Sequence, residues 1–98
     1  MRALERARAY GVEVVIEDLG DWGSSELRSE YDPHRREIRV NLRVARELAG
    51  GELAAFLELA VGHELYHHRE AIGEIATLRE RSAREAAADA FARELTTA

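Results

Sequence analysis

The sequence predicts an α+β fold, with an N-terminal helix and a small antiparallel sheet that contains a β-hairpin, followed by helices. Runs that are β-branched or that alternate apolar and polar residues lie in the first part of the chain. Apolar residues at helical spacing occupy the rest. No linker or structural repeat divides the 98 residues, and a chain of this length supports one core. We therefore expect residues 1–98 to form a single domain.

The expected helix and strands of the first part follow from local patterns. Residues 1–10 have the spacing of a short amphipathic helix, which Gly11 ends, and residues 12–17 are β-branched and predict a strand. Alternating runs on either side of residues 32–36 predict a hairpin, because aspartate followed by proline favours a type I turn. Residues 18–25, between these strands, are expected to form a loop.

The chain from residue 42 onward is expected to be helical. We expect a short helix to residue 48, a break at Gly50 and Gly51, and a long helix over about 52–70. A capping-box pattern, Ser82-Ala83-Arg84-Glu85, predicts the start of a last helix that runs to about residue 95.

Composition excludes several classes of function. The net charge of −5 argues against general nucleic-acid binding, which needs a basic surface. The chain has no cysteine, which excludes disulfides and thiolate metal sites and fits a reducing compartment. The most apolar stretch, residues 53–62, contains a glutamate and is too short to span a bilayer, and no targeting segment is visible. We expect a soluble, cytoplasmic protein without a membrane partner.

The segment His63-Glu64-Leu65-Tyr66-His67 is an H-E-x-x-H motif inside the predicted long helix. At about 100° per residue the two histidines lie about 40° apart on the helix and one turn apart along it. Both imidazoles can therefore reach one metal ion, and Glu64 can reach a water on that metal. The alternative is a pair of structural histidines with a salt-bridged glutamate.

A catalytic zinc ion takes three protein ligands, so a third ligand is expected further along the chain. Glu85 and Asp89 lie at i and i+4 on the predicted last helix and share a face with alanines. A face of alanines allows two helices to approach closely, which would bring a short side chain to the metal. Alternatively, Glu85 only closes the capping box with Ser82, and Asp89 is solvated.

Together these motifs resemble those of the gluzincin metallopeptidases, which combine H-E-x-x-H with a later Glu-x-x-x-Asp helix. Residues 82–92 resemble the glutamate helix of HtpX-like and ImmA/IrrE peptidases, and residues 31–41 resemble the hairpin before the ImmA/IrrE active-site helix. The short length is similar to that of minimal gluzincins. The resemblance covers residues 31–95 and implies a single minimal zincin-like metallopeptidase domain, with an active-site helix and a C-terminal glutamate helix.

The resemblance also implies a role for each site residue. His63, His67 and Glu85 would bind Zn²⁺, Glu64 would be the general base, and Asp89 would hydrogen-bond a ligand histidine. A zinc-bound water would then hydrolyse a peptide bond of a peptide or protein substrate, which makes the chain a zinc metalloendopeptidase. We expect the substrate to pair with an edge strand at residues 37–42. No lower subdomain follows the glutamate helix, so a shallow cleft is expected.

Other functions and residues stay open at this point. The alternatives are a zinc-stabilised regulatory or binding module with little turnover, a latent peptidase (zymogen) covered by a terminus or a partner, and a helical interaction domain without metal. Neither the oxyanion donor nor the oligomeric state follows from the sequence. His68 is expected at the surface or in packing, and His34 in solvent. Core or loop anchoring is expected for the aromatic residues Tyr10, Trp22 and Tyr31.

Overall fold

The computed structural model describes residues 1–21 and 27–97, so the predicted position of Trp22 lies outside the described residues. The described part of the chain contains helices and a small sheet, which confirms the α+β class. In chain order its elements are α1 (Arg2–Ala9), β1 (Glu13–Glu17), β2 (Ser29–Asp32), β3 (Glu37–Asn41), α2 (Leu42–Ala45), α3 (Gly50–Ala71) and α4 (Arg81–Thr97).

The sheet is mixed, and the expectation of an antiparallel sheet is wrong for its first strand. The predicted hairpin is present, because β2 and β3 pair antiparallel with Tyr31 opposite Ile38. However, β1 pairs parallel with β3, and the strand order is β1-β3-β2. Ile38 and Val40 of β3 are fully buried, whereas Ile16 of β1 is 49% exposed. The strand whose apolar side chains are most buried therefore takes the central position, and β1 is left at an edge.

This strand order also corrects the expected edge for substrate pairing. Residues 37–42 include β3, which has a neighbour on both sides and cannot accept a further strand. The edge strands are β1 and β2, and β2 is the one that lies against α3. The hairpin prediction was therefore correct about the pairing, but it did not show which of the two strands lies outermost.

The outer face of the sheet carries a charged group that we call the Arg39 cluster. The guanidinium of Arg39 forms ion pairs with carboxylates of all three strands, and its side chain is 18% exposed. The partners and their N–O distances are Glu17 at 3.6 Å, Glu30 at 2.9 Å, Asp32 at 3.1 Å and Glu37 at 2.6 Å. These hydrogen bonds raise the pKa of Arg39 further above its usual value, so the cluster contains a permanent cation.

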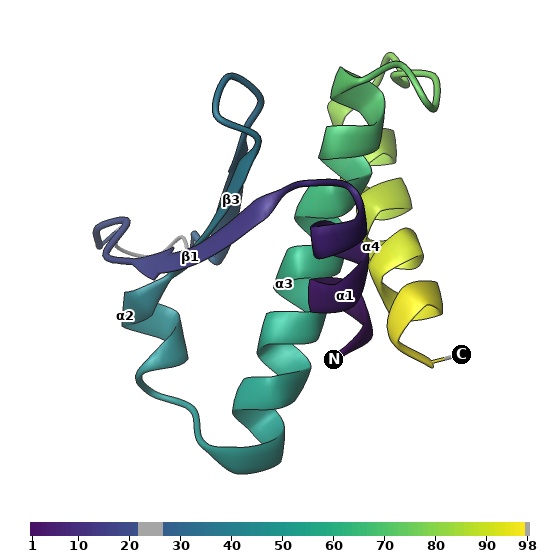
Figure 1. The fold of residues 1–98 in the computed structure, drawn as a ribbon. Helices are drawn as coiled ribbons and strands as arrows, with labels where there is room; N and C mark the ends of the chain where they lie inside the picture. The colour runs from purple at the N-terminus through teal and green to yellow at the C-terminus, as the bar shows by residue number, and fades with distance from the viewer. Residues whose placement is uncertain (22–26, 98) are drawn as a thin grey trace.

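The helices pack on the other side of the sheet. Figure 1 shows α4 alongside α3, with α1 lying against both. Gly62 of α3 faces Ala92 of α4 so closely that a Cβ added at Gly62 would lie 2.9 Å from the Cα and Cβ of Ala92. Ala88 and Ala92 are 0% and 2% exposed, which confirms that the alanine face of the last helix is a packing face.

Two of the expected helix boundaries differ from the structure. The break before the long helix falls at residues 46–49, and Gly50 begins α3 with a φ of 55°. A positive φ is accessible to glycine, so the glycines allow the turn into the helix and do not interrupt it. The last helix begins at Arg81, and the Arg84 amide bonds the Glu80 carbonyl, so Ser82 lies within the first turn and is not the N-cap.

The hydrophobic core joins the inner face of the sheet to α1 and α3. Its fully buried members include Ala3, Ile38, Val40, Val61 and Leu65. A search of the described residues finds no helix with the length and hydropathy needed to cross a membrane.

Candidate metal centre

Helix α3 brings the two motif histidines together at its surface. His63 and His67 lie one turn apart, and their Nε2 atoms are 3.3 Å apart. Their side chains are 20% and 17% exposed, so both rings are largely buried but reach a cavity. The spacing of the two histidines therefore brings their imidazoles together, as the sequence predicts.

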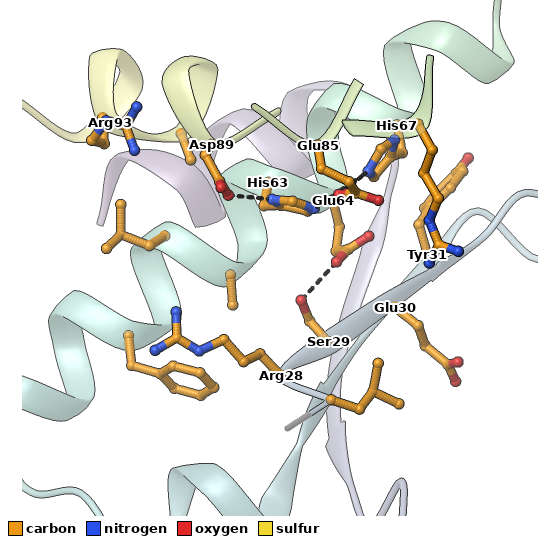
Figure 2. A pocket seen from close by; sticks show the side chains of 16 residues that line it. Arg28, Ser29, Glu30, Tyr31, His63, Glu64, His67, Glu85, Asp89 and Arg93 are labelled. Carbon is orange, nitrogen blue, oxygen red and sulfur yellow. Dashed lines mark hydrogen bonds and ion pairs between the residues drawn. The ribbon is translucent and has the colours of Figure 1, made fainter. Parts of the chain in front are cut away.

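Helix α4 supplies Glu85 to the same point. Its Oε2 atom lies 2.8 Å from His63 Nε2 and 3.5 Å from His67 Nε2. The close packing of Gly62 against Ala92 allows a side chain as short as glutamate to reach across from α4. Figure 2 shows the carboxylate of Glu85 beside both imidazoles. We call His63, His67 and Glu85 the ligand triad, since their atoms are placed to hold a metal ion.

Two of the three separations in the ligand triad are close to those around a tetrahedral metal ion, and the third is a hydrogen-bonding distance. A tetrahedral ion with bonds of about 2.1 Å separates its ligand atoms by about 3.4 Å. The three separations in the triad are 2.8, 3.3 and 3.5 Å. With neutral imidazoles protonated on Nδ1, each of the three converging atoms presents a lone pair, so they repel one another unless a cation lies between them.

Each ligand histidine has a carboxylate on its other ring nitrogen. Asp89 Oδ1 lies 2.7 Å from His63 Nδ1, so Asp89 does hydrogen-bond one of the two histidines. Glu70 Oε1 lies 2.7 Å from His67 Nδ1. Since a carboxylate only accepts, both Nδ1 atoms donate, and in the neutral form of each ring the lone pair is then on Nε2.

Glu70 was missed in the sequence, although a signal for it exists. It follows His67 by three residues, so it lies on the same face of the helix one turn further on. Arg84 Nε donates a hydrogen bond of 3.3 Å to Glu70 Oε2. Burial raises the pKa of Glu70, but the hydrogen bonds from His67 and Arg84 outweigh this effect, and the pKa lies below its usual value.

Glu64 lies beside the ligand triad and belongs to the buried residues of α3. It is 6% exposed, and its Oε2 atom accepts a hydrogen bond of 2.7 Å from the hydroxyl of Ser29 (Figure 2). Burial raises the pKa of Glu64 above its usual value, while Ser29 and the nearby histidines oppose the rise. The role of Ser29 has no sequence signal, because it depends on a contact between β2 and α3 that only the fold creates.

A groove passes the ligand triad. A cavity of about 620 Å³ extends from the triad over Phe56, Leu59 and Ala60, with residues 27–31 of the β2 edge along its side. A second cavity, of about 470 Å³, extends the other way past Pro33 and Thr77. Both cavities include Glu64, His67 and Glu85 in their lining, so the space continues on both sides of the candidate metal position.

The other histidines lie outside the ligand triad. His68 is 1% exposed, packs edge-on against the rings of Tyr10 and Tyr31, and hydrogen-bonds the Tyr31 hydroxyl at 2.6 Å. It is thus a packing residue, and burial lowers its pKa. His34 is exposed in the hairpin turn, as expected.

Comparison of the chain with protein-family models, with curated proteins and with solved structures finds no match. The geometry of the site and the motifs of the sequence are therefore the basis for inferring a function.

Proposed function

We propose that this protein is a zinc-dependent metalloendopeptidase of the gluzincin type. The observation that carries the proposal is the convergence of three ligand atoms from His63, His67 and Glu85 within 2.8–3.5 Å, with the buried carboxylate of Glu64 beside them. Two imidazoles and one carboxylate are a donor set that catalytic zinc sites use, and they leave a fourth position for water or substrate.

Zinc would be held by the Nε2 atoms of His63 and His67 and by the Glu85 carboxylate. A bound zinc ion supplies Lewis acidity, which lowers the pKa of water to about 7 and polarises the carbonyl of the scissile bond. Asp89 keeps the proton of His63 on Nδ1, and this leaves Nε2 unprotonated for the metal.

Glu64 is the general base in this proposal. Its carboxylate takes the proton of the attacking water and passes it to the nitrogen of the leaving amine. Ser29 holds one carboxylate oxygen by a hydrogen bond, so the other oxygen is available for proton transfer. The raised pKa of Glu64 brings it closer to neutrality, where a group can both accept and return a proton.

The substrate is proposed to bind as an extended peptide along β2. This strand lies at the edge of the sheet, and its residues line the larger cavity together with the ligand triad (Figure 2). A peptide can hydrogen-bond to the free edge of such a strand. Because the groove continues on both sides of the triad, the chain of a substrate can extend past the scissile bond in both directions, which favours an endopeptidase.

The decisive experiment compares the parent protein with Glu64→Gln. Glutamine keeps the shape of the side chain but cannot act as a base, so zinc content should stay at about one ion per chain. Hydrolysis of an unstructured protein substrate should fall by about 10²–10⁴-fold. Both quantities are measured on the same zinc-loaded samples, by elemental analysis and by a fluorogenic cleavage assay.

The exposed His34 provides a matched control. His34→Gln also changes a titratable side chain, but His34 is exposed in the hairpin turn and lines neither cavity, so cleavage should be unchanged. Equal cleavage by the parent and Glu64→Gln would remove Glu64 from the mechanism. Zinc binding by a parent that cleaves nothing would contradict the peptidase proposal and favour a zinc-stabilised binding module.

A further inference from the structure

Glu70 is a buried carboxylate whose two oxygens contact two different side chains. Oε1 accepts a hydrogen bond from His67 Nδ1 at 2.7 Å, and Oε2 accepts one from Arg84 Nε at 3.3 Å. Only 5% of the Glu70 side chain is exposed. The side chain lines the smaller cavity together with His67 and Arg84, and none of the catalytic steps above uses this residue.

The hydrogen bond to Glu70 determines what the His67 ring presents to the ligand triad. With the proton on Nδ1, the lone pair of His67 is on Nε2, which faces His63 Nε2 at 3.3 Å. The same bond prevents the ring from turning about its Cβ–Cγ bond. If the ring turned, a carbon would replace Nε2 at this point, and the triad would lose one ligand atom.

Arg84 links this hydrogen bond to the second helix of the site. It lies on α4 directly before Glu85, and it pairs with a carboxylate of α3. A buried carboxylate is costly unless it is paired and hydrogen-bonded, so the guanidinium stabilises the charge of Glu70 where it is needed. The pair therefore anchors Glu70 beside His67.

We infer that Glu70 is a positioning residue, which sets the tautomer and the ring orientation of His67, and that Arg84 holds the Glu70 carboxylate for this task. The inference rests on the proposed function in one respect, namely that the ligand triad binds a metal. Asp89 contacts His63 in a similar way, but its side chain is 57% exposed. The Glu70 side chain is only 5% exposed, so water competes less for its hydrogen bonds than for those of Asp89.

The first test measures the tautomer of His67 in the metal-free protein. Nitrogen-15 NMR distinguishes a neutral ring with its proton on Nδ1 from one with its proton on Nε2, and both from a doubly protonated ring. The parent should show the Nδ1–H form. Glu70→Leu removes the acceptor and keeps the volume, so His67 should become a mixture of tautomers. Glu70→Gln, whose amide oxygen accepts the same bond, should keep the parent form.

The second test measures zinc affinity by calorimetry with zinc as the only ligand. Glu70→Leu should bind zinc about 10–100-fold more weakly than the parent, because loss of such a partner typically has this effect. Glu70→Gln should recover most of the loss. Asp89→Leu is the matched control on the exposed side, and it should lose less affinity than Glu70→Leu. Thermal melting of each metal-free variant verifies that it is folded.

Two results would overturn the inference. One is a His67 tautomer that is unchanged in Glu70→Leu. The other is an equal fall in zinc affinity in Arg84→Met and in Glu70→Leu, with the His67 tautomer of Arg84→Met unchanged from the parent. The ion pair between the two helices would then explain the loss of affinity. If Glu70→Leu does not fold, Glu70→Gln and Arg84→Met are compared instead, by the same measurements of the His67 tautomer and of zinc affinity. If the parent binds no zinc, the proposed function fails, and the tautomer measurement still decides the role of Glu70.

Discussion

On the outer face of the sheet four carboxylates surround the guanidinium of Arg39, whereas between α3 and α4 three carboxylates surround the imidazoles of His63 and His67. The two groups have similar acidic residues and hydrogen-bond lengths. They differ in the group that the carboxylates contact. The guanidinium is a cation at every accessible pH, while an imidazole is largely neutral above about pH 7.

This difference separates an ion-pair cluster that is complete within the protein from a site at which we propose that a metal ion binds. Arg39 satisfies its carboxylates within the protein, and its hydrogen bonds raise its own pKa. In the ligand triad the Nδ1 protons are already used by Asp89 and Glu70. With neutral rings, the atoms that face one another are all acceptors, an arrangement that the proposed metal ion would satisfy.

The largest expected effect that tests this comparison is stabilisation by zinc. At a zinc concentration of about 1,000 times Kd, binding stabilises the native state by about 4 kcal/mol, which for a domain of this size raises Tm by about 15–30 °C. Excess chelator should reverse the change. Thermal melting with and without zinc measures it.

The ligand variants show whether this stabilisation comes from the triad. His63→Ala and Glu85→Ala should each lose most of the zinc-dependent rise in Tm. Arg39→Met should keep it, although its metal-free stability changes. If both triad variants melted with the same zinc-dependent rise as the parent, the metal would bind elsewhere and the comparison would fail.

A smaller effect is expected when α3 and α4 are forced apart. In Gly62→Ala the new Cβ would lie 2.9 Å from the backbone Cα of Ala92, so α4 must shift. Overpacking of this kind costs about 1–3 kcal/mol. Zinc affinity should also fall, because Glu85 moves with α4 while the histidines stay on α3. Urea unfolding and zinc calorimetry measure the two quantities.

Gly51 offers a matched control for this substitution. It lies on the same helix, its φ is not positive, and a Cβ there would meet nothing within 4 Å. Gly51→Ala should leave zinc affinity unchanged. The interpretation of the close α3–α4 contact would be wrong if Gly62→Ala bound zinc as tightly as Gly51→Ala.

The smallest effect is expected in the Arg39 cluster. Hydrogen bonds from the Arg35 amide and from the Arg39 guanidinium lower the pKa of Asp32. A lowered pKa gives stability that is present at neutral pH and disappears as the pH falls through the pKa of the folded state. Asp32→Asn should therefore be slightly less stable than the parent near pH 7, and the difference should vanish near pH 2.

Urea unfolding at both pH values measures this difference, and about 1 M NaCl at pH 7 should reduce it because the cluster lies at the surface. A difference that grew in acid would contradict the sign of the pKa shift. A difference at pH 7 as large as that of Gly62→Ala would show that the Arg39 cluster is more than a surface ion-pair group.

The features that the sequence predicted are those that depend on spacing within one helix. The convergence of His63 and His67 follows from the helical repeat, and the alanines around Glu85 indicate which face of the last helix packs. Glu70 was within reach of the same reasoning, since it lies one turn beyond His67.

The features that were not predicted depend on contacts between distant segments. Alternation along residues 37–41 shows that they form a strand with one buried face, but it carries no information on whether β1 pairs parallel or antiparallel with it. The hydrogen bond from Ser29 to Glu64 likewise exists only because β2 packs on α3. Topology thus decided the edge strand and the partner of the proposed base.

The placement of the ligand triad on two consecutive helices has a consequence for the unfolded chain. A metal held by His67 and Glu85 would close the loop that contains residues 72–80, as a disulfide would in a chain that had cysteines. His67 and Glu85 lie 18 positions apart, and closing a loop of roughly this length removes about 3 kcal/mol of unfolded-state entropy in the chain-entropy model. Because this term grows only by about 0.6 kcal/mol for each doubling of loop length, the connection between α3 and α4 is free to lengthen, while the helix faces that it joins are not free to change.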